Sequence, residues 1–211
     1  MSIYTIDHKT MQRLTLYLHY LQSFPKNANI DISREIIAEN LQMNPKVVRK
    51  DLEMLCPSAK PTGYNVGELI HSIGQYIYCP HVTPVVLVGV GKLGKALMSY
   101  AGFTVFELDV LAGFDVNPDV IRKGVCGKSV YPMEKLKTTC KRLGAHIGII
   151  TVPGGCAQAV CDMLIDAGVL AIWNFTSTRL VVPEHIMVIN EDMSETLVRL
   201  SEHVTKNHAE K

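Results

Sequence analysis

The chain has 211 residues, of which 47% are hydrophobic, and a formal net charge of +1. This length fits one large domain or two modest ones, and the apolar content excludes a disordered chain. No apolar run approaches the roughly 20 residues of a membrane span, and the first residues lack a signal-peptide pattern, so we expect a cytoplasmic protein with no membrane association.

The charge and the cysteines set two further expectations. A net charge of +1 means that any nucleic-acid interface has to be a local basic surface. None of the six cysteines forms a Cys-x-x-Cys pair or has paired histidines at zinc spacing, so we expect no metal site. We expect reduced and mostly buried thiols at Cys56, Cys79, Cys126, Cys140, Cys156 and Cys161.

The first 78 residues show apolar side chains at helical spacing. One helix face, in a helix that ends at Phe24-Pro25, is predicted from Met11, Leu14, Leu18 and Leu21. Ser33 has the residue type preferred at an N-cap and predicts a second helix through Asn40.

A third predicted helix completes a helix-turn-helix pattern. Asn44 as N-cap and Pro45 as the first helical residue predict a helix that runs to about Leu55. The predicted outer face carries basic residues that suit base edges and phosphates of a DNA major groove, namely Lys46, Arg49 and Lys50. Asp51 and Glu53 dilute this charge, so an ordinary solvated face is the alternative.

A turn-rich stretch, residues 57–64, follows the third helix. Lys60 in this stretch is either a wing residue on the phosphate backbone or an ordinary loop lysine. A further amphipathic helix is predicted, with its inner side formed by Val66, Leu69, Ile70, Ile73 and Ile77. Pro80 and Pro84 then suit a short linker.

From Val85 onward, short apolar strands alternate with helical segments. We expect strands at 85–88, 110–115, 147–152, 170–175 and 187–190, and helices at 92–101, 133–143, 156–167 and 193–204. The alternation predicts an α/β fold, a Rossmann-type doubly wound parallel sheet with helices on both faces. The last helix has an apolar stripe with no partner in the completed sheet: Met193, Leu197, Leu200 and Val204.

The strongest motif is Gly89-Val90-Gly91-Lys92-Leu93-Gly94, which follows an apolar strand and opens a helix. This is the context of the G-x-G-x-x-G dinucleotide fingerprint, in which helix N–H groups face the pyrophosphate. Asp115 ends the next strand, where a carboxylate accepts from both ribose hydroxyls and repels a 2′-phosphate. The pattern therefore favours NAD(H) over NADP(H), and a glycine-rich turn that binds nothing is the alternative.

A second constellation, Thr151-Val152-Pro153-Gly154-Gly155, follows a buried strand. It suits a wall for the nicotinamide half, although an ordinary strand–helix turn fits equally well. Acid–base chemistry is hard to place, because His146 begins a strand while His185 and Arg179 have no obvious carboxylate partner. We therefore expect a binding protein and no catalytic residue.

Further segments extend the pattern along the chain. In order they are Val48–Leu52, Gly63–Val66 with Leu69, Val88–Gly94, Tyr100–Phe103, Phe114–Pro118, Val130–Pro132 with Leu136, Thr151–Pro153, Asn174–Phe175 and Val182–Pro183. Together they resemble the Rex family of redox-sensing transcriptional repressors, and the match covers nearly the whole chain.

The resemblance implies a domain-swapped homodimer. It divides the chain into a winged-helix DNA-binding domain at 1–79, a Rossmann NAD(H)-binding domain at 80–190 and a swapped C-terminal helix at 191–211. It further implies that NADH closes the dimer and releases inverted-repeat operator DNA, whereas NAD⁺ favours DNA binding. Through the matched segments it adds the cofactor residues Val116 and Asn174 and the DNA-binding residue Tyr64. It adds Met193 as a cofactor residue because the family inserts the side chain at this position into the partner's nicotinamide pocket.

The resemblance also implies switch residues, namely His19, Tyr100 and Asp192. The family often has an arginine at the position of His19 and an aromatic residue where Met193 follows Asp192. Its wing is usually glycine-rich with a basic residue, where this chain has Lys60 between two prolines.

The sequence therefore predicts a repressor that senses the NADH/NAD⁺ ratio. Two alternatives stay open: a small NAD-dependent oxidoreductase, and a Rossmann binding module for another nucleotide such as coenzyme A. Asp115 counts against coenzyme A, because its carboxylate suits a ribose diol.

Overall fold

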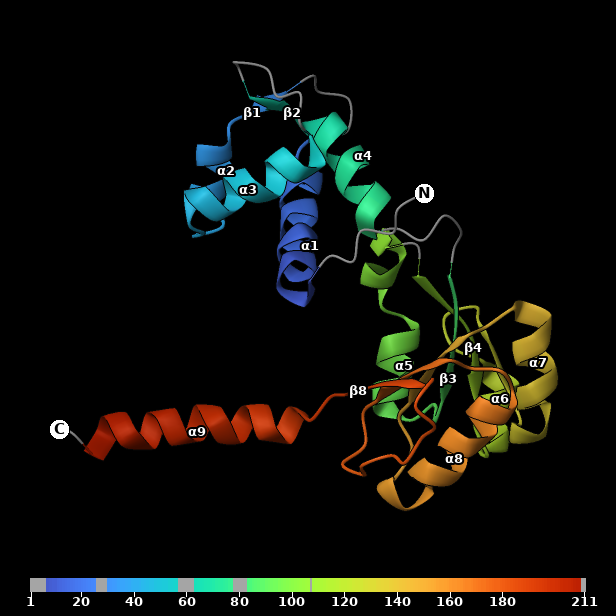
Figure 1. Ribbon diagram of the computed structural model, residues 1–211. Coiled ribbons are helices and arrows are strands. Elements are labelled where there is room, and N and C mark those ends of the chain that lie inside the picture. The colour runs from blue at the N-terminus through green and yellow to red at the C-terminus, as the bar shows by residue number, and fades with distance from the viewer. Residues whose placement is uncertain (1–6, 26–29, 57–62, 78–82, 107, 210–211) are drawn as a thin grey trace. The chain divides into compact units, whose positions relative to one another are not determined.

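The computed structural model describes residues 7–25, 30–56, 63–77, 83–106 and 108–209. The chain divides into two compact units, Met1–His81 and Val82–Lys211, which are coloured blue to green and green to red in Figure 1. Each unit has its own core, and we describe each by itself. Cys79, Lys60 and most of the expected linker lie outside the described residues.

The first unit is a helical module with a small sheet (Figure 1). Its helices are α1 (His8–Gln22), α2 (Arg34–Asn40), α3 (Pro45–Leu55) and α4 (Val66–Ile77). Its antiparallel strands are β1 (Asp31–Ile32) and β2 (Tyr64–Asn65). The buried side chains that hold these elements together include Leu14, Tyr17, Leu18, Leu21, Ile37, Val48, Leu52, Leu69 and Ile73.

Local signals placed these helices correctly. The Ser33 hydroxyl accepts from the N–H of Ile36 and the Asn44 side chain accepts from that of Lys46, so both predicted N-caps are confirmed. The sequence missed the β1–β2 pair, because strands of two residues are too short to show an alternating pattern.

The second unit contains a six-stranded parallel sheet in the order β5-β4-β3-β6-β7-β8. The strands are β3 (Thr83–Val88), β4 (Leu108–Phe114), β5 (Ser129–Tyr131), β6 (Ile147–Ile150), β7 (Ala171–Asn174) and β8 (Met187–Asn190). The helices are α5 (Lys92–Met98), α6 (Pro118–Lys123), α7 (Leu136–Leu143), α8 (Gly154–Asp166) and α9 (Met193–Ala209). The predicted α/β class and parallel sheet are confirmed.

Two apolar layers cover the sheet. Residues of α7 and α8 pack on one face, against side chains such as Val86, Phe114 and Ile150. Residues of α5 and α6 pack on the other, against Val85 and Ile149. The strand order reverses between β3 and β6, which makes their carboxyl ends the switch point where ligands bind in such sheets.

Several boundaries differ from prediction. The helix expected at 92–101 ends at Met98, and a 3₁₀ helix, Ala101–Phe106, follows it. The helix expected from Met133 begins with a 3₁₀ turn. Thr83 and Pro84 belong to β3 and not to a linker, whereas α6 and β5 were missed because both are short.

The expectation of mostly buried thiols was wrong. Of the cysteines that the structure describes, Cys140 and Cys161 are buried, Cys56 is half-buried, and Cys126 and Cys156 are exposed. Burial raises the pKa of both buried thiols, that of Cys161 to about 11. These two thiols are therefore core side chains and poor nucleophiles.

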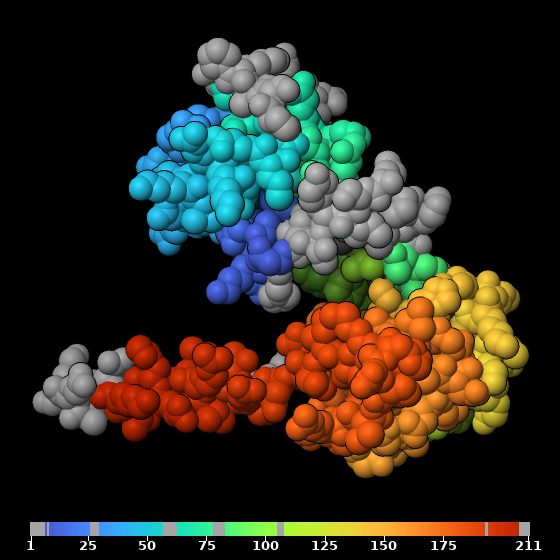
Figure 2. All heavy atoms as spheres, in the orientation of Figure 1, coloured from blue at the N-terminus to red at the C-terminus, as the bar shows by residue number. Residues whose placement is uncertain are grey.

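Helix α9 exposes the apolar stripe predicted from the sequence. Leu197, Leu200 and Val204 of that stripe are each more than half exposed, as is the neighbouring Val198, and Figure 2 shows the atoms of α9 (red) uncovered. The side chain of Met193 lies outside the described residues. Among the helices that the structure describes, none is long and apolar enough to cross a bilayer.

We predict that Asn44→Ala lowers the free energy of unfolding by about 1 kcal/mol, because it removes the cap of α3. Urea denaturation followed by far-UV circular dichroism measures this. Asn44→Asp keeps a capping oxygen and is the control. Equal stabilities of Asn44→Ala and the parent chain would contradict the capping role.

Candidate functional site

The glycine turn lies between the carboxyl end of β3 and the start of α5. Gly89 has a φ of +97°, and a Cβ there would lie 2.8 Å from the carbonyl oxygen of Thr151. A Cβ on Gly94 would collide with the Gly89 carbonyl oxygen, whereas one on Gly91 would meet nothing within 4 Å. Gly89 and Gly94 therefore permit the tight turn, and Gly91 leaves an open approach to the backbone.

The Asp115 carboxylate is anchored beside this turn. Its Oδ2 accepts from the backbone N–H of Val90 at 2.7 Å, and its Oδ1 accepts from that of Asn117 at 2.8 Å. The side chain thus links the end of β4 to the glycine turn. Each carboxylate oxygen keeps further acceptor capacity, which is what two ribose hydroxyls require.

Thr151 joins the end of β6 to the same turn. Its hydroxyl lies 2.7 Å from the Gly89 carbonyl oxygen and 3.2 Å from that of Val88, and donates to them. Pro153 then precedes α8, whose first turn has no side-chain cap. The first turns of α5 and α8 thus follow adjacent strand ends, an arrangement that suits a dinucleotide pyrophosphate at α5 and a polar ring substituent at α8.

The remaining residues that the sequence predicts to bind the cofactor differ in accessibility. Lys92 and Val116 are exposed, Leu93 and Val152 are half-buried, and Val90 is buried. Asn174 is fully buried, and its side-chain amide is hydrogen-bonded within the protein. A direct contact of this amide with a ligand is therefore not supported.

The three predicted switch residues lie on three different elements. His19 is exposed in the last turn of α1. Tyr100 is exposed after α5, with its ring edge-on to Phe103 at 5.0 Å. Asp192 caps α9, since its Oδ1 accepts from the N–H groups of Ser194 and Glu195.

The basic face of α3 is on the surface. Lys46, Arg49 and Lys50 are all exposed, and Arg49 forms an exposed ion pair of 2.6 Å with Glu53. Tyr64 is only 7% exposed and burial raises its pKa, which favours a packing role over a DNA contact.

Asp51 does not dilute the basic face, because it points into the core of the first unit. It is 4% exposed and accepts from Arg13 Nε at 2.6 Å, from Arg13 Nη2 at 2.9 Å and from the Tyr17 hydroxyl at 2.9 Å. The pairing with Asp51 raises the pKa of Arg13, and burial together with this hydrogen bond raises that of Tyr17. An ionic cluster, in which Asp51 and Tyr17 are buried and Arg13 is half-buried, thus fixes α3 on α1.

The sequence contained a signal for this cluster. Val48, Asp51, Leu52 and Leu55 recur at the spacing of one inward helix face. An acidic residue on such a face requires a buried partner, and Arg13 and Tyr17, four residues apart on α1, supply two.

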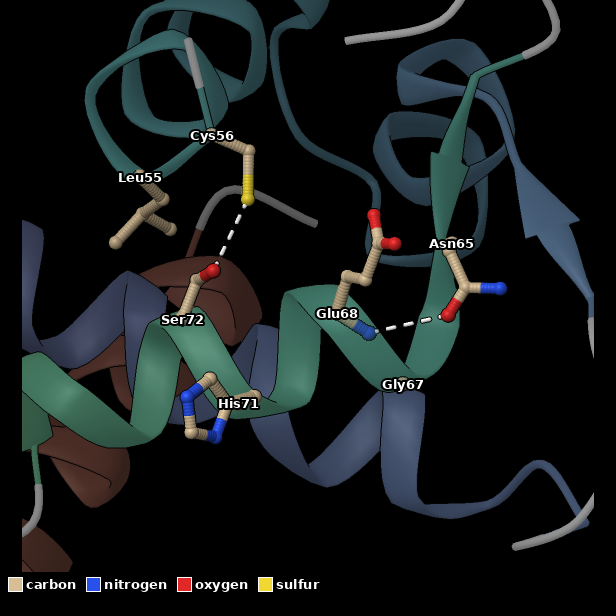
Figure 3. A pocket seen from close by; sticks show the side chains of 7 residues that line it. All are labelled: Leu55, Cys56, Asn65, Gly67, Glu68, His71 and Ser72. Atoms are coloured by element: carbon tan, nitrogen blue, oxygen red, sulfur yellow. Dashed lines mark hydrogen bonds between the residues drawn. The ribbon is translucent and has the colours of Figure 1, made fainter. Parts of the chain in front are cut away.

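A hollow of about 580 Å³ lies at the end of α3 (Figure 3). It is lined by Leu55, Cys56, Asn65, Gly67, Glu68, His71 and Ser72. The Cys56 thiol donates to the Ser72 hydroxyl at 3.2 Å, so its two nucleophilic groups satisfy each other. We interpret the hollow as a gap in the packing between the end of α3 and α4, and we assign it no ligand.

His146 lies at the amino end of β6, whereas the glycine turn follows the carboxyl end of the adjacent strand β3. His146 precedes β6, and its Nδ1 lies 3.0 Å from the carbonyl oxygen of Gly168. Among the described residues, no three His, Cys, Asp or Glu side chains form a group that could hold a metal ion.

Comparisons with known proteins match both units. Residues 81–178 match a family model described as a CoA binding domain, and residues 5–53 match one described as a putative DNA-binding protein N-terminus. A protein named redox-sensing transcriptional repressor Rex from Porphyromonas gingivalis is 35% identical over 89% of this chain and 87% of its own length. One of the same name from Streptomyces coelicolor is 35% identical over 97% of this chain and 80% of its own length.

Solved structures are similar to this chain over nearly its whole length. The repressor RSP in complex with β-NAD⁺ and operator DNA is 27% identical, with a TM-score of 0.85 over 97% of this chain and 94% of that chain. RSP in complex with β-NADH is 26% identical, with a TM-score of 0.79 over 97% of both chains.

We predict that the buried cluster contributes strongly to stability. Asp51→Ala leaves the Arg13 charge and the Tyr17 hydroxyl without their acceptor, and the free energy of unfolding falls by about 3 kcal/mol. Tyr17→Phe removes one hydrogen bond to a charged acceptor and costs about 1.5 kcal/mol. Urea denaturation gives both values, and Asp51→Ala at parent stability would contradict the prediction.

We predict that Asp115→Ala weakens NADH binding at least about tenfold, since one charge-assisted hydrogen bond is worth about 1.5 kcal/mol or more. Isothermal titration calorimetry measures the affinity. Asp115→Asn retains the shape and one acceptor oxygen, so its affinity lies between the two. Unchanged NADH affinity in Asp115→Ala would refute the assignment of Asp115.

Proposed function

Because the chain belongs to the Rex family of redox-sensing transcriptional repressors, we propose that it represses transcription from operator DNA and that NADH binding releases it. NAD⁺ competes for the same cleft and favours the DNA-bound form. The observation that carries this proposal is the Asp115 carboxylate, anchored by two backbone amides beside an open glycine turn. The same chain presents a basic helix in its other unit.

The residues present fit a dinucleotide. Gly89 through Gly94 receive the pyrophosphate, Asp115 holds the adenosine ribose, and the exposed Val116 lies against the adenine. Thr151 through Pro153 and Met193 border the nicotinamide half. The dinucleotide supplies the redox signal, and the protein distinguishes its two oxidation states by binding.

Operator recognition falls to the winged-helix domain, residues 1–79. The basic face of α3 contacts base edges and phosphates in the major groove of DNA through Lys46, Arg49 and Lys50. Lys60 contacts the phosphate backbone of the DNA. The net charge of the chain is only +1. The protein therefore depends on this local surface, which a homodimer doubles.

The C-terminal helix, residues 191–211, holds the homodimer as a swapped element. The exposed stripe of Leu197, Val198, Leu200 and Val204 supports this assignment, because such a stripe requires an apolar partner.

The Rossmann domain, residues 80–190, then transmits the cofactor state through His19, Tyr100 and Asp192. We place the protein in the cytoplasm, together with its operator DNA.

The proposed sensor binds the dinucleotide without turning it over. His146 lies at the amino-terminal edge of β6, and His185 and Arg179 are exposed between β7 and β8. An acid–base group has to lie near the nicotinamide, at the carboxyl edge. Consumption of NADH with a carbonyl substrate would favour the oxidoreductase alternative.

A second candidate ligand is coenzyme A, because residues 81–178 match a family model described by that cofactor. The Asp115 carboxylate favours the free ribose diol of NAD(H). In a competition titration, NADH displaced only by NAD⁺ supports the redox sensor. Displacement of NADH by equimolar coenzyme A would support the second candidate.

The function is tested by operator binding. Fluorescence anisotropy with an inverted-repeat operator duplex, at one stated salt concentration, is measured with increasing NADH and then with NAD⁺. We expect NADH to weaken binding by about 5- to 150-fold, the usual range of allosteric coupling. Operator affinity indifferent to both dinucleotides would overturn the proposal.

We predict that Arg49→Ala weakens operator binding by about tenfold and leaves NADH affinity unchanged, because the two sites lie on different units. Glu53→Ala is the matched control. It removes the carboxylate that pairs with Arg49, so operator affinity stays equal or rises. Normal operator binding by Arg49→Ala would show that α3 does not contact DNA as assigned.

A further inference from the structure

The Asn174 carboxamide joins two strand ends and a loop. It is fully buried at the end of β7. Its Nδ2 donates to the Thr178 carbonyl oxygen and to Asn190 Oδ1, both at 2.9 Å. Its Oδ1 accepts from the N–H of Thr176 at 3.1 Å and from the Thr176 hydroxyl at 2.8 Å.

This network leaves the amide no alternative orientation. The Thr178 carbonyl can only accept and the Thr176 N–H can only donate, so the amide cannot be flipped. Both acceptor sites of Oδ1 and both hydrogens of Nδ2 are in use. Asn174 therefore acts inside the protein and not on a ligand.

One end of the network touches the first turn of α8. The Thr178 hydroxyl donates to the carbonyl oxygen of Gly154 at 3.0 Å, and a Cβ on Gly154 would lie 2.8 Å from that hydroxyl. Gly154 directly follows Pro153, at the edge of the cleft assigned to the dinucleotide. A ligand that shifts this turn therefore shifts Thr178.

The other end leads to α9. Asn190 is the cross-strand neighbour of Asn174 at the end of β8, and the N–H of Glu191 donates to the Asn174 carbonyl oxygen at 2.8 Å. Asp192, the next residue, caps α9. Hydrogen bonds thus connect Gly154 to Asn190 and Glu191, and the backbone leads from Glu191 directly to Asp192 at the start of the C-terminal helix.

We infer that Asn174 is a positioning residue that transmits cofactor occupancy from Gly154, through Thr178 and Asn190, to the start of α9. Asn174 at the centre of this network is fully buried and fully paired, so the amide resists moving alone, because it would lose partners where water cannot replace them. The loop 176–178 and the end of β8 therefore move together. This inference rests on the proposed function and deepens it.

Asn190 offers the cleaner test, because it is exposed while Asn174 is buried. Asn190→Ala removes the acceptor for Asn174 Nδ2, and Asn190→Asp restores an acceptor oxygen. Gln158→Ala is the matched control. Gln158 holds the same loop from α8 through two 2.9 Å bonds to the backbone of Val181, and neither of these bonds involves β8.

The experiment measures a coupling ratio in the full-length chain: the operator dissociation constant with saturating NADH divided by that without. We expect Asn190→Ala to reduce the ratio by about fivefold or more, within the usual range of coupling. Operator affinity without NADH and NADH affinity without operator stay within about twofold of the parent values. Asn190→Asp recovers the ratio, and Gln158→Ala retains it.

The possible results distinguish a failure of the Asn174 link from a failure of the proposed repressor function. A parent ratio of one overturns the proposed function. A normal parent ratio that Asn190→Ala leaves unchanged overturns the inference alone, and so does a loss that Asn190→Asp fails to restore. An equal loss of the coupling ratio in Gln158→Ala would show that any loosening of the loop between β7 and β8 reduces coupling. This result would also overturn the Asn174 link. A large loss of NADH affinity in Asn190→Ala would make Asn190 a binding residue and would contradict the positioning role.

Discussion

The Asp115 carboxylate is the group around which the candidate cofactor cleft is organised. By accepting from the amides of Val90 and Asn117, it ties the end of β4 to the turn that leaves β3. Thr151 makes the corresponding tie from β6. The strand ends on both sides of β3 are thus fixed to one glycine turn, and this rigid arrangement suits a site proposed to bind a ribose and a pyrophosphate.

In the first unit, by contrast, the anchored carboxylate is that of Asp51, and it faces the core. Asp51 draws Arg13 and Tyr17 of α1 to α3, and the basic residues of α3 are left on the outer face. Since the removal of one partner of a buried pair costs far more than the net worth of the pair, this cluster tolerates little change in the packing of α3 on α1. The orientation of α3, the helix that we propose to contact DNA, is therefore set from inside the unit.

The sequence predicted the parts of this protein that depend on neighbouring residues. The caps at Ser33 and Asn44 and the glycine turn at Gly89 were found because each is a local pattern. The pair β1–β2 and the burial of Asp51 depend on segments distant in sequence. The hydrogen bond between Asn174 and Asn190 was missed for the same reason, since Asn190 lies 16 residues away and is brought close only by the pairing of β7 with β8. The family resemblance supplied the cofactor and the operator, and the structure added how the residues are held.

In the proposed repressor, NADH bound to the second unit lowers the affinity of the first unit for operator DNA, and bound operator lowers the affinity for NADH. Thermodynamic linkage requires the effect to be reciprocal. The most direct test is calorimetric titration of NADH into the parent chain, alone and in the presence of saturating operator duplex. We predict that operator weakens NADH binding by the same factor by which NADH weakens operator binding. An NADH affinity unchanged by bound operator would contradict it.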